Sequence, residues 1–192
     1  MAAQIPDVFM YKARGFHIAG IDGPSLFHPE KHGLEPNGRT PICWRGYVCF
    51  YYIDDDGYLA LKGLGAFNEK EPPPVFGVKP QLTEEAKNKK IGFDYSYEKV
   101  DTKLPLTGGL LIGDGIEREY VSPAGFHPAW KYKEVYELRY ENGKIISETE
   151  RSKEMGAIRR GMTRFPKRDR PKKDFSCEYG NYRIMNEDAT WF

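Results

Sequence analysis

Hydrophobic and polar residues alternate along residues 135–150, which is the pattern of a strand with one buried face. Tyr136, Leu138 and Tyr140 occupy every second position, and the residues between them are charged. The pair Asn142-Gly143 interrupts the alternation, and both residue types tolerate the positive φ angles of a type I′ turn. This segment is therefore predicted to form a β-hairpin with one buried and one exposed face.

A second hairpin is predicted over residues 47–67. The run YVCFYYI, residues 47–53, has no helical period and is rich in aromatic and β-branched residues, which favours a strand covered on both faces. The polar segment DDDG, residues 54–57, ends this run, and YLALKGLGAF, residues 58–67, resumes the hydrophobic pattern. A turn between two strands is the expected result.

Two more segments indicate strands. The alternating apolar positions of the first are Ile91, Phe93, Tyr95 and Tyr97. The second, residues 108–121, is predicted to contain a short buried strand, a glycine turn at residues 113–115 and another strand. A phosphate-binding loop is not predicted at this turn, because neither of the usual glycine motifs is present and no helix follows.

The hydrophobic period becomes helical after Glu150. The apolar residues that then recur at helical spacing are Met155, Ile158 and Met162. Ser147 and Glu150 match a capping box, so the main helix is predicted over residues 148–162. A shorter helix is predicted over residues 83–90, with Thr83 as its N-cap.

These elements predict a β-rich α+β fold, with antiparallel sheets built from two hairpin units and one main helix. A chain of 192 residues fits a single domain, residues 1–192, that folds without staples. The alternative is two intimate lobes, residues 1–80 and 91–165, followed by a C-terminal tail at residues 174–192. The apolar composition of that tail predicts that it adds a strand to the sheet or inserts into a partner.

An internal duplication is a further hypothesis. Trp44 precedes Gly57 by thirteen positions and Trp130 precedes Gly143 by the same interval, so the hairpins superpose at an offset of 86. Each unit also follows a Phe-His-Pro sequence. Hairpins commonly share turn glycines, however, and an aromatic-rich chain offers chance tryptophan matches.

Charge and composition narrow the class of protein. The 29 basic and 28 acidic residues nearly cancel, so no overall field directs the chain to nucleic acid or membranes. The three cysteines form no CxxC motif, which favours reduced thiols, and the longest apolar run is too short to cross a bilayer. The N-terminus lacks the apolar core of a signal peptide. We expect a cytoplasmic protein with no membrane association.

The histidines are the first candidates for chemistry. His28 and His32 have the spacing of a zinc-binding helix, but Pro29 and Gly33 leave room for barely one turn, so no metal site is predicted. His127 or His28 remains a candidate acid/base residue beside Asp114 or Asp22. The alternative role of His127 is structural, with its imidazole bonded to a loop carbonyl.

The aromatic and basic residues are the candidates for binding. An aromatic groove is predicted to bind a ligand, and its candidate residues are Trp130, Trp44 and Phe126. Residues 159–173 carry eight Lys or Arg and one acid, and are read as a solvated connection, an acidic protein's docking site or a nucleic-acid contact. The residues predicted to contact a partner are Arg159, Arg160, Arg164, Lys167, Arg168, Trp191 and Phe192.

Three functional hypotheses follow. The first is a cytoplasmic binding or interaction protein with an aromatic groove and either a protein partner or a second copy of itself. The second is a small-molecule enzyme that uses His127 or His28 with an aspartate, and the third is a nucleic-acid-binding accessory protein acting through residues 159–173. No cofactor motif is present in the sequence, so no cofactor is predicted.

Overall fold

The computed structural model describes residues 3–38, 40–88, 90–117, 120, 125–163 and 182–183. The strands are β1 (Val8–Tyr11), β2 (Arg14–Asp22), β3 (Tyr47–Ile53), β4 (Leu59–Ala66), β5 (Gln81–Leu82), β6 (Tyr95–Tyr97), β7 (Thr102–Lys103), β8 (Gly108–Ile116), β9 (Tyr132–Glu141) and β10 (Lys144–Glu150). The helices are α1 (Glu84–Lys87) and α2 (Ser152–Thr163), with short 3-10 helices η1 (Pro29–His32) and η3 (Ala129–Lys131). The β-rich α+β class is confirmed, and α2 is the main helix.

All ten strands belong to one sheet, in the order β10-β9-β8-β2-β1-β3-β4-β6-β5, with β7 beside β4. β1 runs parallel to β3, and the other ladders among the described residues are antiparallel. The sheet is therefore mixed, whereas the sequence predicted antiparallel sheets. The parallel pair arises because residues 23–46 carry the chain from β2, on one side of β1, to β3 on the other, a crossover of the length that parallel pairing requires.

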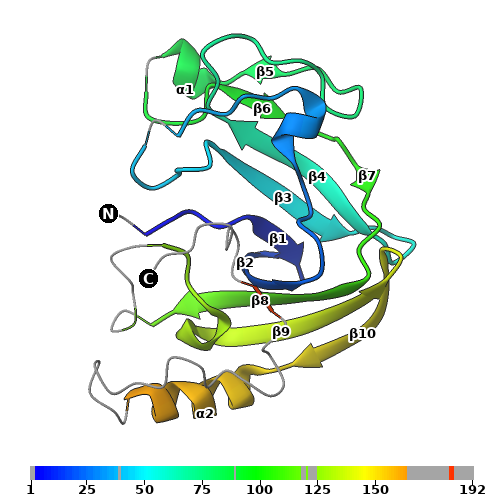
Figure 1. The fold of residues 1–192 in the computed structure, drawn as a ribbon, viewed down its shortest axis with the longest axis vertical. Helices are drawn as coiled ribbons and strands as arrows, with labels where there is room; N and C mark the ends of the chain where they lie inside the picture. The colour runs from blue at the N-terminus through cyan, green and yellow to red at the C-terminus, as the bar shows by residue number, and fades with distance from the viewer. Residues whose placement is uncertain are drawn as a thin grey trace.

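The two predicted hairpins are β3–β4 and β9–β10, and their turns touch, so the sheet curls toward closure at one end (Figure 1). The amide nitrogen of Leu59 donates to the carbonyl oxygen of Gly143 at 2.8 Å, and that of Ile145 donates to Gly57 at 2.9 Å. Asn142 and Gly143 have φ angles of 47° and 83°, as the predicted type I′ turn requires. A side chain at Gly143 would clash with the Leu104 carbonyl, so the contact between the turns needs glycine there.

The main core fills the inner face of the curled sheet. It combines aliphatic and large aromatic residues, the most buried of which include Phe9, Phe16, Tyr51, Leu59, Leu61, Tyr97, Leu110, Ile112, Leu138 and Tyr140. A second cluster lies on the outer face of β8 and β9, where Met155 of α2 packs against Leu111, Trp130 and Val135. A third, smaller cluster on the outer face of β1 and β3 contains Cys43, Val48 and Phe67. Figure 1 shows α2 beneath β9, on the side away from the inner face.

The main helix begins four residues later than predicted. β10 continues to Glu150 and α2 begins at Ser152, so the predicted capping box of Ser147 and Glu150 is wrong. The reason is that cross-strand pairing holds Ser147 beside Arg139 and Glu150 beside Tyr136, which keeps both residues extended. The short helix is confirmed in a shorter form, with the Thr83 hydroxyl accepting a hydrogen bond from the Ala86 amide at 3.1 Å.

The strand order bears on the predicted lobes and duplication. β6 and β7, from the range 91–165, join the edge beside β4, whereas β8 pairs with β2 in the middle of the sheet. The two-lobe division stays a prediction. The internal duplication is not confirmed, and the tryptophans that suggested it have unlike surroundings, since Trp44 is 40% exposed and Trp130 only 8%.

Residues 182 and 183, the last two that the structure describes, lie against the sheet. Ile21 forms a pair of antiparallel backbone hydrogen bonds with Arg183, both at 2.8 Å, so this part of the C-terminal tail lies against β2. Tyr182 fits beside Gly20 and Gly109, and its hydroxyl donates to Glu137 at 2.6 Å. Among the described residues, no helix is long and apolar enough to cross a bilayer.

Candidate functional site

The predicted acid/base histidines do not meet the predicted aspartates. His127 is buried, and among the residues that the structure describes its Nδ1 atom has no hydrogen-bond partner. Asp114 instead binds Arg14 at 3.2 Å, and Asp22 binds Arg139 at 2.7 Å. The acid/base role of His127 therefore stays a prediction, and both predicted aspartates are paired with arginines.

His28 does lie near a carboxylate, but on an exposed surface. Its Nδ1 atom is 3.2 Å from Glu30, and the two side chains are 39% and 67% exposed. Both residues belong to the η1 turn, where no residue is buried. Both side chains of this pair are therefore open to solvent.

His17 in β2 was not among the residues predicted from the sequence, and its charge acts on His127. Its Nδ1 atom is 3.2 Å from the hydroxyl of Tyr132, and burial lowers the pKa of His17. Burial also lowers the pKa of His127, with further lowering by the charges of Lys131 and His17. Burial thus disfavours the charged form of both imidazoles.

The predicted groove residues are dispersed. Trp130 packs in the outer cluster, which α2 covers, whereas Phe126 packs against the inner core. Trp44 lies in the turn before β3, where its amide donates to Gln4 Oε1 at 2.7 Å. The structure therefore brings these three residues into no shared groove.

Of the predicted partner residues, only two lie in the described part of the chain. Arg159 donates to the carbonyl oxygens of Trp130 and Tyr132 and to Glu117, so its guanidinium is held within the fold. Arg160 is exposed on α2. The remaining five lie outside the described residues: Arg164, Lys167, Arg168, Trp191 and Phe192.

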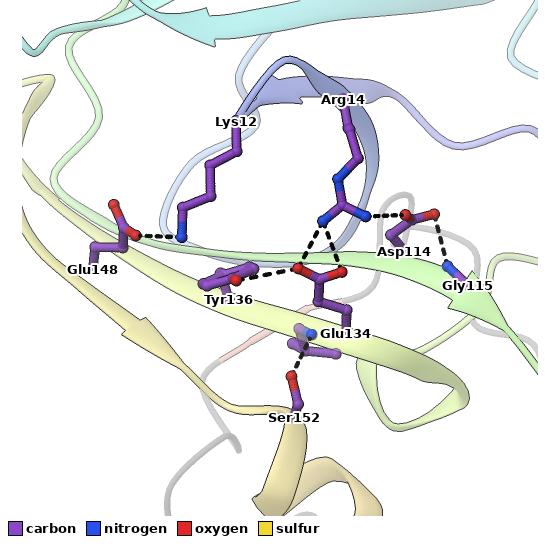
Figure 2. Close-up of polar contacts among 9 residues, drawn as sticks. Lys12, Arg14, Asp114, Gly115, Glu134, Tyr136, Glu148 and Ser152 are labelled. Atoms are coloured by element: carbon purple, nitrogen blue, oxygen red, sulfur yellow. Dashed lines mark hydrogen bonds and ion pairs between the residues drawn. The ribbon is translucent and has the colours of Figure 1, made fainter.

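A cluster of ion pairs surrounds the β1–β2 turn (Figure 2). Arg14 Nη2 donates to both carboxylate oxygens of Glu134 at 2.7 Å, and Arg14 Nη1 donates to Asp114 at 3.2 Å. The hydroxyl of Tyr136 also donates to Glu134, at 3.1 Å. These bonds, led by those from Arg14, lower the pKa of Glu134.

The turn itself directs Lys12 into the same cluster. Lys12 and Ala13 have φ angles of 48° and 60°, a left-handed conformation that residues other than glycine adopt at a cost. The Lys12 ammonium lies 4.2 Å from the centre of the Tyr136 ring and 3.2 Å from Glu148. We call Lys12, Arg14, Asp114, Glu134 and Glu148 the charge clamp.

The charge clamp fastens the β1–β2 turn to β8, β9 and β10. Every charged group in it has an opposite charge within 3.2 Å. Its cationic side chains also lie over aromatic rings at the border of the inner core. The clamp is therefore read as a structural feature.

The outer face of β1, β3 and β4 contains an open hollow of about 440 Å³. Its lining is mainly apolar and comes from four segments of the chain; it includes Met10, Phe50, Gly63, Gly65, Phe93 and Ser96. Gly63 and Gly65 alternate with Leu64, which belongs to the inner core, so the missing side chains face outward. We call this space the outer hollow.

The glycines of β4 are required by their neighbours. A side chain at Gly65 would clash with the ring of Phe93, and one at Gly63 would clash with the carbonyl oxygen of Tyr97. The Tyr97 carbonyl and the Phe93 ring therefore occupy the space that side chains at Gly63 and Gly65 would fill. The outer hollow lies beside this carbonyl and this ring. Alternating glycines in LKGLGA were the sequence signal for this site, but their partner Phe93 is 28 residues away from Gly65.

A tightly held loop forms one rim of the outer hollow. Lys99 and Asp101 have φ angles of 56° and 45°, again left-handed. The Val100 amide donates to the Lys62 carbonyl at 3.0 Å, and the Tyr52 hydroxyl donates to Asp101 at 3.0 Å. These bonds fix residues 98–101 against β3 and β4, so that Lys62 and Lys99 both line the hollow.

Cofactor and family evidence adds no further constraint. Among the described residues, no group of three His, Cys, Asp or Glu side chains is placed to hold a metal ion. Comparison of the chain with protein-family models, curated proteins and solved structures finds no match. The function therefore has to be argued from the geometry of this chain.

Proposed function

We propose that this protein binds a small, mainly apolar molecule in the outer hollow. The observation that carries the proposal is the hollow itself, with a volume of about 440 Å³ and a mainly apolar lining. Small-molecule sites in proteins occupy roughly 300–1,000 Å³ and combine apolar walls with a few polar groups. The outer hollow matches this description in size and in lining.

The walls favour a flat ligand. Phe50 and Phe93 contribute aromatic rings to the lining, and Met10 adds a flexible apolar side chain from β1. Ser96 is an uncharged polar residue of the same lining. An aromatic ring system packed against Phe50, Phe93 and Met10 uses this apolar area and leaves its polar group at the rim.

The proposal keeps the binding function expected from the sequence but moves its site. It relies on neither Trp44 nor Trp130, and it does not involve the basic segment at residues 159–173. Contact of that segment with a protein or nucleic acid remains a separate, sequence-based hypothesis. The cytoplasmic location likewise remains a prediction.

Titration with 2-naphthalenemethanol tests the proposal. A neutral ligand of this size is expected to bind with a dissociation constant of about 1 mM, from roughly 0.3 kcal/mol of binding free energy per ligand atom. Two-dimensional amide NMR is expected to show the largest shifts at Gly63, Gly65 and Phe93. Shifts scattered over the surface, or none at the highest soluble concentration, would contradict the proposal.

A pair of matched variants localises the binding. Ser96→Trp places an indole in the hollow, because Ser96 lines it, and is expected to remove the titration. Ser147→Trp makes the same change on the exposed strand β10 and is expected to leave the dissociation constant unchanged. Equal binding by both variants would place the ligand elsewhere.

A further inference from the structure

We infer that the ligand of the outer hollow is an anion: an aromatic ring system that bears a carboxylate or a similar acidic group. This inference rests on the proposed function and names the class of molecule. Three charged side chains line the hollow, Lys62, Glu98 and Lys99, so its charged lining sums to +1. The ring of the ligand packs against the apolar part of the lining and its acidic group lies at the rim.

Several other cations of the fold are paired with a carboxylate, unlike these two lysines. Lys12, Arg14, Arg45 and Lys103 each have a carboxylate within 3.3 Å. Among the described residues, no carboxylate lies within 4.0 Å of the ammonium group of Lys62 or Lys99. The nearest aromatic contact of Lys62 is weak, with its ammonium 6.0 Å from the centre of the Tyr52 ring.

The backbone holds these two lysines at one rim. The hydrogen bond from the Val100 amide to the Lys62 carbonyl joins the residue next to Lys99 directly to β4. Val100 is buried in the inner core, so this junction is anchored from beneath. Lys62 also stands at the β-bulge where the β3–β4 register shifts, an irregularity that redirects a side chain.

Nearby acids reduce the attraction without cancelling it. Glu98 lines the same hollow, and Asp101 lies in the same loop but is bound by the Tyr52 hydroxyl. Removing the charge of Glu98 should therefore strengthen anion binding, while removing either lysine should weaken it. The opposite signs of these two effects separate electrostatic recognition from a general change in the pocket.

Three probes with the same ring test the inference: 2-naphthoate, 2-naphthalenemethanol and 2-naphthylmethylammonium, each titrated by calorimetry. The carboxylate is expected to bind about 3-fold to 10-fold more tightly than the alcohol, since exposed charge pairs contribute modestly. The ammonium probe is expected to bind most weakly. The advantage of the carboxylate should shrink as salt is raised from about 20 mM to about 500 mM, because salt screens exposed charges.

Variants of the three charged residues complete the design. Lys62→Gln and Lys99→Gln should each reduce the affinity for 2-naphthoate about 2-fold to 5-fold, a larger reduction than either variant causes for the alcohol. Glu98→Gln should tighten 2-naphthoate by a similar factor. Lys144→Gln, on β10, is the matched control and should alter neither affinity.

The outcomes separate this inference from the proposed function. If the three probes bind equally in the hollow and the lysine variants change nothing, the ligand class is wrong while the binding site stands. Tightest binding of the ammonium probe would also overturn the anionic class. If no probe binds, or if Ser96→Trp binds all three as the wild type does, the proposed site itself is wrong.

Discussion

The guanidinium group of Arg14 binds the carboxylate of Glu134 through two hydrogen bonds of 2.7 Å, although the residues are 120 positions apart. Arg14 begins β2 and Glu134 lies in β9, with β8 between the two strands. The bond therefore spans three strands of the sheet. It fixes the β1–β2 turn over the border of the inner core.

This ion pair predicts a dependence of stability on acid. The pKa of Glu134 is lower in the folded protein than its ordinary value of 4.5, because Arg14 binds the ionised form. The stabilisation is therefore present above pH 4.5 and is lost as the pH falls through the folded pKa. Glu134→Gln should lower the thermal midpoint at pH 7, and the difference from wild type should vanish near pH 2.

Thermal unfolding followed by circular dichroism at several pH values measures this difference. Glu141→Gln, at the exposed end of β9, is a suitable control, with no change in midpoint expected at any pH. A constant gap between wild type and Glu134→Gln from pH 7 to pH 2 would show that packing, and not charge, is responsible.

Two histidines, the buried His127 and the half-buried His17, predict a second, separate pH window. The pKa values of His17 and His127 lie below the ordinary 6.5, chiefly because of burial, so the unfolded chain takes up protons before the folded protein does. Stability should then fall as the pH decreases below 6.5, and this loss should end at the folded pKa values. This window is separate from that of Glu134, whose pKa lies below 4.5.

Histidine variants test this window. His17→Gln and His127→Gln should each remove up to about one proton from the uptake on unfolding near pH 6, and so flatten the dependence of stability on pH. His28→Gln is the control, because the His28 side chain is 39% exposed. Urea unfolding between pH 7.5 and 5 gives the slopes, and equal slopes in all four proteins would refute the assignment.

The core tyrosines predict opposite effects of the same substitution. Tyr140 is 2% exposed and its hydroxyl has no hydrogen-bond partner in the described part of the chain, whereas the hydroxyl of the similarly buried Tyr97 donates to the Pro73 carbonyl at 2.8 Å. An unpaired buried hydroxyl costs about 1 kcal/mol or more. Tyr140→Phe should therefore raise the free energy of unfolding by about 1 kcal/mol, and Tyr97→Phe should lower it by about 1 kcal/mol.

Urea titrations with equal m-values for all three proteins would make the comparison valid. Two changes of the same sign would contradict the prediction, because they would mean that the hydrogen bond of Tyr97 contributes nothing that distinguishes it from Tyr140.

Local patterns in the sequence sufficed for much of the fold. The hairpins were predicted because their alternation and turn residues, such as Asn142-Gly143, lie within a few positions of each other. The start of α2 was misplaced because the extended form of Ser147 and Glu150 depends on pairing with β9, which local propensity does not contain. The parallel β1–β3 pair depends on a crossover that has no strand signal of its own.

The candidate site was harder to predict for the same reason. Gly63 and Gly65 of β4 have no side chains, and the outer hollow lies next to them. Met10 from β1 and Phe93 from the segment before β6 contribute to its lining. No periodicity links such distant positions. Histidines drew attention because they are rare, yet the residue that pairs with Tyr132 is His17, which stands inside an ordinary strand pattern.

The final prediction concerns a buried ion pair, Asp7 with Arg45. Arg45 Nη2 lies 2.6 Å from Asp7 Oδ1, the same oxygen accepts from the Cys49 amide at 2.8 Å, and the two charged side chains are only 5% and 7% exposed. Removing one partner of such a pair leaves an uncompensated buried charge and costs about 3–5 kcal/mol. Arg45→Met should lower the free energy of unfolding by that amount.

The double variant separates the cost of an unpaired charge from the value of the pair. Asp7→Asn combined with Arg45→Met leaves no buried charge, and the side-chain carbonyl of the introduced asparagine replaces the acceptor of the Cys49 amide. The double variant should therefore be more stable than Arg45→Met alone.

Arg14→Met, at the exposed charge clamp, is the control. It should cost less stability than Arg45→Met, because water solvates the carboxylates that it leaves behind. Denaturant unfolding of the full double-mutant cycle measures the coupling. Additive effects of the two single substitutions would show that Asp7 and Arg45 stabilise the fold independently. Arg45 would then act through its packing against Tyr47 and Phe126, and Asp7 through its hydrogen bond from the Cys49 amide.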